Sequence, residues 1–136
     1  MLARVAESKR ADQLRAEERA RFLARHDALT GLPNRDFFLE HLRQTLPAAC
    51  ERGEQVQVQV LNLAGFSAIN GALGHNVGDR VLIEVARKLN QGVSAGQFVA
   101  RLGGDEFGIM SAGPVSPAQA AEHAERILAV IEHPLR

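Results

Sequence analysis

The sequence predicts an α/β domain in which helices pack on a small sheet. The first observation is a run of period two, in which valines alternate with glutamines from Gln55 to Val60, as in a half-buried strand. The second is a pair of short apolar segments, 97–102 and 107–110, joined by Gly-Gly-Asp-Glu, which predicts an antiparallel hairpin. The third is the helical periodicity of the segments around them. Together they predict a hairpin beside a strand, in a sheet that helices cover on at least one face.

Two helices are predicted before the strand. Residues 1–26 are rich in Arg, Glu and Ala, contain no Gly or Pro, and carry only scattered apolar residues. A helix with so narrow an apolar stripe does not fold alone, so this segment is either half of a two-stranded coiled coil or a solvated linker helix. The breakers Thr-Gly-Leu-Pro-Asn end it. Residues 35–50 then form a second helix with Phe38, Leu42 and Leu46 on one face.

The remaining elements are assigned in the same way. The strand runs on to Leu63 through apolar residues around one polar residue, as a buried central strand would. A short helix at 66–73 and a longer one at 77–90 follow. The last predicted helix begins with a capping box at Ser116 and ends before Pro134.

Composition excludes several classes of function. Lys+Arg and Asp+Glu are both 16, so net charge gives no sign of a nucleic-acid partner, and without Trp or Tyr base-stacking platforms are not expected. The single cysteine, Cys50, excludes an internal disulfide. No apolar run approaches the roughly 20 residues that cross a bilayer, and the N-terminus is too polar for a signal peptide. We therefore expect a cytoplasmic domain, although a longer parent protein could be anchored in a membrane.

The Gly-Gly-Asp-Glu turn is the first candidate site. Asp105 and Glu106 sit at a hairpin tip, where both side chains can reach one side. The glycines remove bulk, so a ligand can approach the backbone closely. Carboxylates beside a phosphate need a cation between them, and Mg²⁺ is the natural choice. The alternative is a solvated hairpin turn with no ligand.

A second candidate site lies between Leu61 and Asp79. Where the strand gives way to the helix near Phe66, free N–H groups can bind phosphate oxygens. Asn70 and Asp79 carry an amide and a carboxylate, which suit the polar edge of guanine. The alternative for each is a local cap or turn residue. The segment has no Gly-Lys-Ser/Thr, so it is not a P-loop.

Three stretches of the chain occur in a characteristic order and spacing: DALTGLPNR, GFSAINGALGHNVGD and RLGGDEF. In these stretches the chain resembles the GGDEF domain of diguanylate cyclases, from about residue 27 to residue 136. The resemblance implies a palm-like nucleotidyl-cyclase fold, an α+β sandwich whose central, partly antiparallel sheet is flanked by helices. It also implies that residues 1–26 are a signalling helix and that residues 27–136 are a GGDEF domain without the usual C-terminal strand, helix and strand.

The resemblance implies a reaction and its partners. Two domains, each holding one GTP, meet face to face, and the 3′-hydroxyl of each nucleotide attacks the α-phosphate of the other. The products are cyclic di-GMP and two pyrophosphates. Two Mg²⁺ ions (or Mn²⁺) activate the attacking oxygen and neutralise the leaving group. The implied partners are GTP, a second copy of the chain paired through the N-terminal helix, an upstream sensor and a downstream phosphodiesterase domain, but not nucleic acid.

The functional positions of the family fall on residues of this chain. The resemblance implies that Asp105 and Glu106 bind metal and help to deprotonate the hydroxyl. It implies further that Gly103 and Gly104 lie against the nucleotide. Asn70 and Asp79 would recognise guanine, and the backbone from Leu63 to Phe66 would hold metal and phosphate.

The end of the first strand departs from the family pattern. Cyclases of the family usually read Asp-Leu-Asp-x-Phe-Lys there, whereas this chain reads Asn-Leu-Ala-Gly-Phe-Ser from Asn62. The first Asp is the metal ligand shared by both ions, and a neutral amide is a poorer ligand for a hard dication. The loss costs on the order of 2–3 kcal/mol, or about a hundredfold in metal affinity or rate.

Three functions therefore remain open. The first is a diguanylate cyclase weakened by Asn62. The second is a catalytically inactive, GTP-binding domain that regulates an attached phosphodiesterase or other output domain. The third is a dimerising module whose N-terminal helix carries the function.

Overall fold

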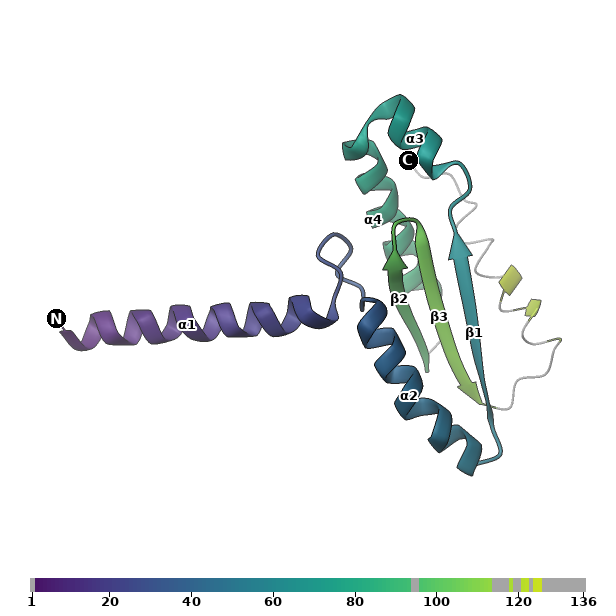
Figure 1. Ribbon diagram of the computed structural model, residues 1–136, viewed down its shortest axis with the longest axis horizontal. Helices are drawn as coiled ribbons and strands as arrows, with labels where there is room; N and C mark the ends of the chain where they lie inside the picture. The colour runs from purple at the N-terminus through teal and green to yellow at the C-terminus, as the bar shows by residue number, and fades with distance from the viewer. Residues whose placement is uncertain (1, 94–95, 114–117, 119–120, 123, 126–136) are drawn as a thin grey trace.

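The computed structural model describes residues 2–93, 96–113, 118, 121–122 and 124–125. Figure 1 shows a long N-terminal helix leading into a domain of one sheet and further helices. The order of the elements is as the sequence predicts up to residue 113: α1 (Leu2–Arg25), α2 (Arg35–Glu51), β1 (Gln55–Asn62), α3 (Phe66–Leu73), α4 (His75–Gly92), β2 (Gln97–Gly103) and β3 (Glu106–Gly113).

Two elements exceed their predicted bounds by more than one residue. β3 extends to Gly113, and α4 begins at His75 rather than at residue 77. The early start of α4 follows from Gly74, which has φ +90° and separates α3 from α4 as a single residue. Glycine adopts this backbone without steric cost, so the chain turns at one residue where the sequence prediction allowed a longer loop.

The three strands form one antiparallel sheet in the order β1-β3-β2. β3, not β1, lies in the middle of the described sheet, which corrects the prediction of a central first strand. Residues 107–110 of β3 are all buried, whereas Val58 and Val60 of β1 are 42 % and 55 % exposed. The period of two correctly indicated a strand, but it carries no information about the position of that strand in a sheet.

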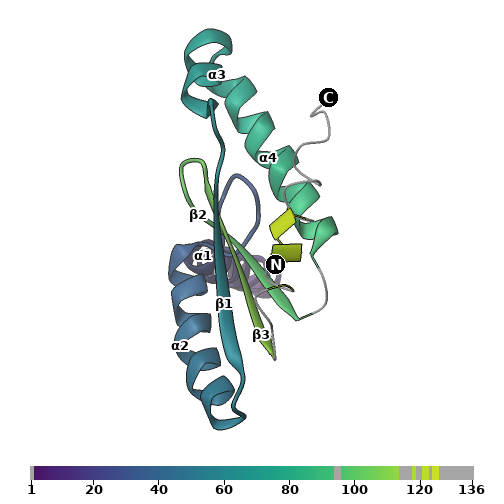
Figure 2. The same ribbon diagram turned by 90° about the vertical axis from the view of Figure 1, so that its right-hand side faces the viewer.

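Helices cover both faces of the sheet, and Figure 2 shows α2 and α4 on opposite sides of it. On the α2 side, Phe38 packs with Ala100 and Met110. The α4 side holds the larger core cluster, which contains Leu32, Leu82, Val85, Ala86, Leu89, Val99, Phe107 and Ile109. Neighbouring residues of β2 and β3 alternate between the two clusters, as the pleat of a strand requires.

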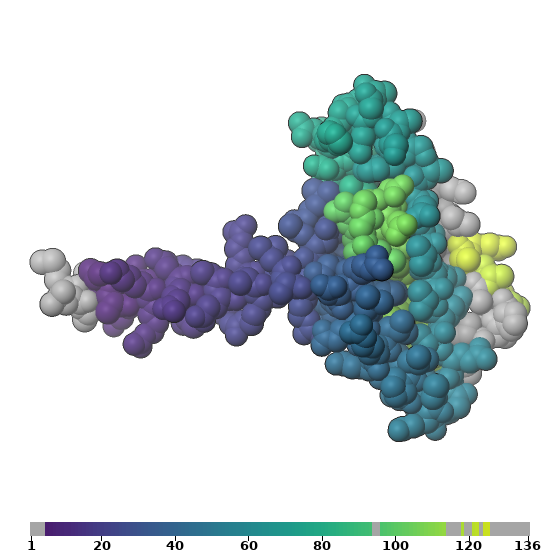
Figure 3. Space-filling model, viewed as in Figure 1, coloured from purple at the N-terminus to yellow at the C-terminus, as the bar shows by residue number. Residues whose placement is uncertain are grey.

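The helix α1 projects from the domain as an arm, as the space-filling view in Figure 3 shows. Every residue from Val5 to Arg25 is exposed. Asn34 joins α1 to α2, because its side-chain oxygen caps α2 at Phe37 N (2.9 Å) and its amide nitrogen donates to Ala24 O (3.0 Å). These two bonds connect the end of α1 to the start of α2.

The last predicted helix falls largely outside the described residues. Of the span from Ser116 to Pro134, residues 118, 121–122 and 124–125 are helical, and both of its predicted ends lie outside the description. Within the part of the chain that is described, the helices are all too short or too polar to span a bilayer.

Candidate functional site

The acidic turn closes the hairpin of β2 and β3. Gly103 pairs with Glu106, so Gly104 and Asp105 form the connection. Gly103 has φ +147° and Gly104 has φ +46°, conformations that side chains with a Cβ rarely adopt. The sequence reads two glycines here because the tight turn requires them, whatever the turn binds.

The end of β1 lies directly against this turn. Asn62 is the register partner of Glu106, and Leu63 N donates a hydrogen bond of 3.2 Å to Asp105 O. Four sequence-predicted metal positions, Asn62, Leu63, Asp105 and Glu106, therefore meet at one edge of the sheet. They come from segments more than forty residues apart in the chain, and the register of β1 on β3 brings them together.

The side chains at this edge are available to a ligand. Glu106 and Asn62 are exposed, and Asp105 is half-buried. Two carboxylates and an amide offer the oxygen ligands that a hard cation such as Mg²⁺ prefers. No three His, Cys, Asp or Glu side chains of the described residues cluster closely enough to hold a metal ion. In this register, Asn62 places an amide and not a third carboxylate opposite Glu106.

The backbone after β1 makes a tight turn into α3. Gly65 has φ +77° and precedes α3 without any side-chain cap, and Phe66 N donates to Leu63 O at 3.3 Å. The Phe66 ring is turned inward and packs against the α4-side core. Phe66 can therefore serve a ligand at the site through its backbone, while its ring fixes the start of α3.

Asn70 and Asp79 lie on the two helices that follow. Neither side chain caps a helix, which rules out the alternative of local cap residues. A Cβ placed on Gly78 would lie 1.7 Å from Asn70 Oδ1, so the absence of a side chain at Gly78 makes room for the Asn70 amide. Asn70 Oδ1 is buried and has no hydrogen-bond partner within the described structure. Asp79 follows Gly78 on α4 and is exposed.

In the described structure, Asn70 and Asp79 are not bonded to the acidic turn. Among the described residues, no hydrogen bond or ion pair joins Asn70 or Asp79 to Asp105 or Glu106. The link between the two clusters is the chain itself, which runs from the end of β1 through Phe66 into α3. Within the described residues, they are therefore two separate clusters of side chains.

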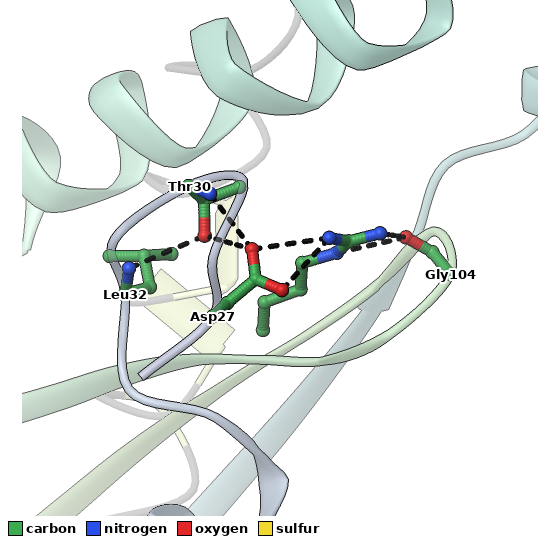
Figure 4. Close-up of polar contacts among 5 residues, drawn as sticks. Asp27, Thr30, Leu32 and Gly104 are labelled. Carbon is green, nitrogen blue, oxygen red and sulfur yellow. Dashed lines mark hydrogen bonds and ion pairs between the residues drawn. The ribbon is translucent and has the colours of Figure 1, made fainter. Parts of the chain in front are cut away.

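An ion pair that the sequence analysis missed holds the turn from behind. Arg101 donates from Nη1 to Asp27 Oδ1 (3.0 Å) and Oδ2 (3.1 Å), and from Nε (3.2 Å) and Nη2 (2.9 Å) to the carbonyl oxygen of Gly104. The two side chains are only 15 % and 20 % exposed. Figure 4 shows that this network ties the loop after α1 to the glycine of the turn.

Thr30 completes the network around Asp27. Its Oγ1 and its backbone N each donate to Asp27 Oδ2 at 2.8 Å, and its Oγ1 accepts from Leu32 N at 3.3 Å. Burial by itself raises the pKa of Asp27, but the hydrogen bonds from Thr30 and Arg101 outweigh burial and hold that pKa below its ordinary value of 3.8. Asp27 and Arg101 are 74 residues apart, so no local spacing in the sequence could have revealed the pair.

A family model described as "Diguanylate cyclase, GGDEF domain" matches residues 24–136. The chain is 42 % identical over 113 residues to the diguanylate cyclase TpbB of Pseudomonas aeruginosa (strain UCBPP-PA14), covering 83 % of this chain and 26 % of that protein. A solved structure of the TpbB GGDEF domain matches with a TM-score of 0.77 at 41 % identity, covering 82 % of this chain and 64 % of that chain.

Two further proteins show similar matches. The bifunctional diguanylate cyclase/cyclic di-GMP phosphodiesterase MucR of Pseudomonas aeruginosa is 42 % identical over 112 residues, covering 82 % of this chain and 16 % of that protein. The solved coiled coil and GGDEF domain of DgcB from Caulobacter crescentus, in complex with c-di-GMP, matches with a TM-score of 0.77 at 31 % identity, covering 92 % of this chain and 66 % of that chain.

The chain thus spans only 16–26 % of the two curated relatives. The family model covers most of the chain, and the two solved structures match its fold over 82 % and 92 % of the chain. By sequence and by its palm-like fold, the chain therefore belongs to the GGDEF family of diguanylate cyclase domains.

Proposed function

We propose that this domain binds GTP where the acidic turn meets the end of β1, and that two copies condense two GTP molecules into cyclic di-GMP. The observation that carries the proposal is the pairing of Asn62 with Glu106, together with the hydrogen bond from Leu63 N to Asp105 O. These contacts gather oxygen ligands from both segments at one exposed edge. Such a set suits a cation bound together with phosphate groups.

Asp105 and Glu106 are the residues we assign to metal binding, with Asn62 and the backbone at Leu63 as the further ligands. When bound, Mg²⁺ (or Mn²⁺) neutralises charge on the phosphates and favours ionisation of the attacking hydroxyl. The exposed carboxylate of Glu106 can receive the proton, with Asp105 beside it. Gly103 and Gly104 present bare backbone, so that the nucleotide can lie against the turn.

We assign guanine recognition to Asn70 and Asp79. Guanine carries N–H donors and a carbonyl acceptor along one edge, and a carboxylate with an amide can match both kinds of group. The unpaired Asn70 Oδ1 supports this assignment, because a buried polar atom without a partner is costly unless a ligand supplies one. We assign phosphate binding to the backbone at the start of α3, near Phe66.

The proposed reaction needs a second copy of the domain, since one site holds one GTP. We propose that residues 1–26 form the signalling helix that pairs two chains and receives input from a sensor, and that residues 27–136 form the catalytic domain. The exposed apolar residues of α1 support pairing, because Leu14, Phe22 and Leu23 are 41–50 % exposed. A domain that consumes GTP is expected in the cytoplasm.

Asn62 favours a second candidate function. With a neutral amide in place of a carboxylate, the site keeps its nucleotide contacts and loses charge where metal would bind. A domain of this kind binds GTP without converting it and regulates an attached output domain. The similarity to MucR, a protein named as both cyclase and phosphodiesterase, is consistent with such an arrangement.

Calorimetric titration of GTP, with and without Mg²⁺, into the intact protein that contains this chain tests the proposal. Product analysis for cyclic di-GMP is carried out on the same samples. We expect magnesium-dependent binding that Glu106→Gln abolishes and that Glu51→Gln, an exposed glutamate at the end of α2, leaves unchanged. Binding with product indicates a cyclase, and binding without product indicates the regulatory function. No binding by the unaltered protein would overturn both.

A further inference from the structure

The junction between α1 and the domain contains an unbroken series of aromatic rings, which we call the ring stack. The ring of Phe22 in α1 stacks on His26, with centroids 4.0 Å apart and planes within 1°. His26 meets the edge of Phe37 in α2 at 5.5 Å, and Phe37 meets Phe98 in β2 at 5.2 Å. His41 stacks on Phe98 at 4.2 Å. The series therefore joins three elements: α1, α2 and β2.

The ring stack is anchored at its inner end and oriented at its outer end. Phe98 packs against the buried cluster of Phe38, Ala100 and Met110, so this end cannot move without disturbing the core. At the other end, His26 Nδ1 lies 3.0 Å from the carbonyl oxygen of Phe22, a distance at which an N–H group donates. This hydrogen bond holds the imidazole parallel to the Phe22 ring.

The other contacts at the junction hold the end of α1 without fixing its direction. Asn34 donates hydrogen bonds to the carbonyl oxygens of Ala24 and Arg25, and both bonds lie at the last two residues of the helix. The ion pair between Arg25 and Glu40 is about half exposed on both sides, and exposed pairs of this kind contribute little. The guanidinium of Arg25 also lies over the Phe37 ring, 4.1 Å from its centroid, but it too belongs to the last residue of α1. Among the described ring contacts, the one between Phe22 and His26 reaches back one turn along α1.

We propose that the ring stack is a joint that sets the direction in which α1 leaves the domain. With every residue of α1 from 5 to 25 exposed, no buried face holds the helix. The stacked rings of Phe22 and His26 oppose bending at the last turn, because aromatic rings have a strong preference for few geometries. Loss of the Phe22 ring turns α1 into a freely pivoting arm, while the domain keeps its fold.

The same joint links α1 to the strand that enters the acidic turn. Phe98 lies three residues before Arg101 on β2, and Arg101 holds the carbonyl oxygen of Gly104. A change in the direction of α1 therefore acts on β2 through packed rings, not through a disordered linker. The importance of this link for cyclisation rests on the proposed function, whereas the joint itself does not.

The test measures the distance between two spin labels by pulsed electron resonance. One label is placed on the native Cys50, which is exposed near the end of α2, and the other on Gln13→Cys, an exposed position on α1. Labelled chain is diluted with an excess of unlabelled chain, so that only distances within one chain are seen. Phe22→Ala removes the outer ring. Leu23→Ala is the matched control, because Leu23 is next to Phe22, is similarly exposed and takes no part in the ring stack.

We expect a narrow distance distribution in the unaltered chain and in Leu23→Ala, and a clearly broader one in Phe22→Ala. Phe22→Tyr keeps the ring and should restore the narrow distribution. Unchanged thermal unfolding in all variants shows that the domain is intact. A distribution in Phe22→Ala as narrow as in the unaltered chain would overturn the proposal, as would equal broadening in Leu23→Ala. No nucleotide is present, so the result is independent of the proposed activity.

Discussion

Two neighbouring segments of the candidate site differ sharply. The hairpin tip from Gly103 to Glu106 keeps both glycines and both carboxylates, and Arg101 and Asp27 hold it from behind. The end of β1 lies in register with it but carries an amide at position 62 and small residues after it. The hairpin tip carries two carboxylates and is anchored by Arg101, whereas the end of β1 pairs with it without contributing a charge.

This difference between the two segments separates backbone register from metal affinity, two properties that one site usually combines. Backbone register is set by strand pairing and packing, which Asn62 satisfies as well as Asp would. Metal affinity depends on charge, which an amide does not supply. Asn62 can therefore keep the backbone register of the proposed site while offering less charge to a metal ion. The following changes test this contrast, in order of decreasing expected effect.

Asn62→Asp should have the largest effect. It places a third carboxylate in register with Glu106, and a charge-assisted contact is worth about 2–3 kcal/mol, so we expect cyclic di-GMP synthesis by the intact protein to rise by about a hundredfold. The same substitution at Asn90, exposed on α4, is the control and should change nothing. Unaltered synthesis in Asn62→Asp would show that the activity is limited elsewhere.

Arg101→Met should have the next largest effect, because it removes the side chain that supports the hairpin tip from Gly103 to Glu106. Asp27 and the carbonyl oxygen of Gly104 would each lose a charged partner, at a cost of about 2 kcal/mol in the free energy of unfolding. Urea denaturation measures the loss, and Arg43→Met, an exposed arginine of α2, provides the comparison. If both variants were equally stable, the network could not be what holds the turn.

Gly78→Ala tests the second part of the site. The added methyl group would collide with Asn70 Oδ1, the free end of a side chain that can rotate away, and alanine favours the helix by about 1 kcal/mol. Stability should therefore change little, while GTP binding weakens by about tenfold through the loss of one hydrogen bond. Gly71→Ala faces open space and should retain its affinity. If calorimetry gave Gly78→Ala and the unaltered protein the same affinity for GTP, Asn70 could not take part in guanine recognition.

The pH dependence of stability should show the smallest effect. Because the pKa of Asp27 is lowered in the folded chain, its ionised form stabilises the fold above the ordinary carboxyl pKa. That contribution disappears as the pH falls from about 4 through the lowered pKa, and for a partly exposed pair it should not exceed about 1 kcal/mol. Urea titrations of the unaltered chain and Asp27→Asn at pH 7 and pH 3 measure it. The stability gap between the two should narrow at pH 3, and a widening gap would contradict the sign.

The sequence by itself determined the elements, because periodicity, breakers and turn glycines are local properties. The valine and glutamine alternation indicated β1, and the Gly-Gly-Asp-Glu stretch indicated the hairpin. Its motifs also located the acidic turn and the amide at Asn62 opposite it, since these depend on residue type alone. The start of α4 and the end of β3 were predicted less accurately. At α4, a single glycine, Gly74, replaces the expected loop.

Only the tertiary structure decided which segments meet. β3 lies between β1 and β2 because it is the strand with both faces buried. A period of two is the same in a central strand and in an edge strand, so it could not indicate this position. The ion pair of Asp27 with Arg101 and the fit of Asn70 over Gly78 join residues that local spacing does not connect. Such contacts arise from packing between elements. They form only when the chain folds, so the spacing of residues along the sequence does not predict them.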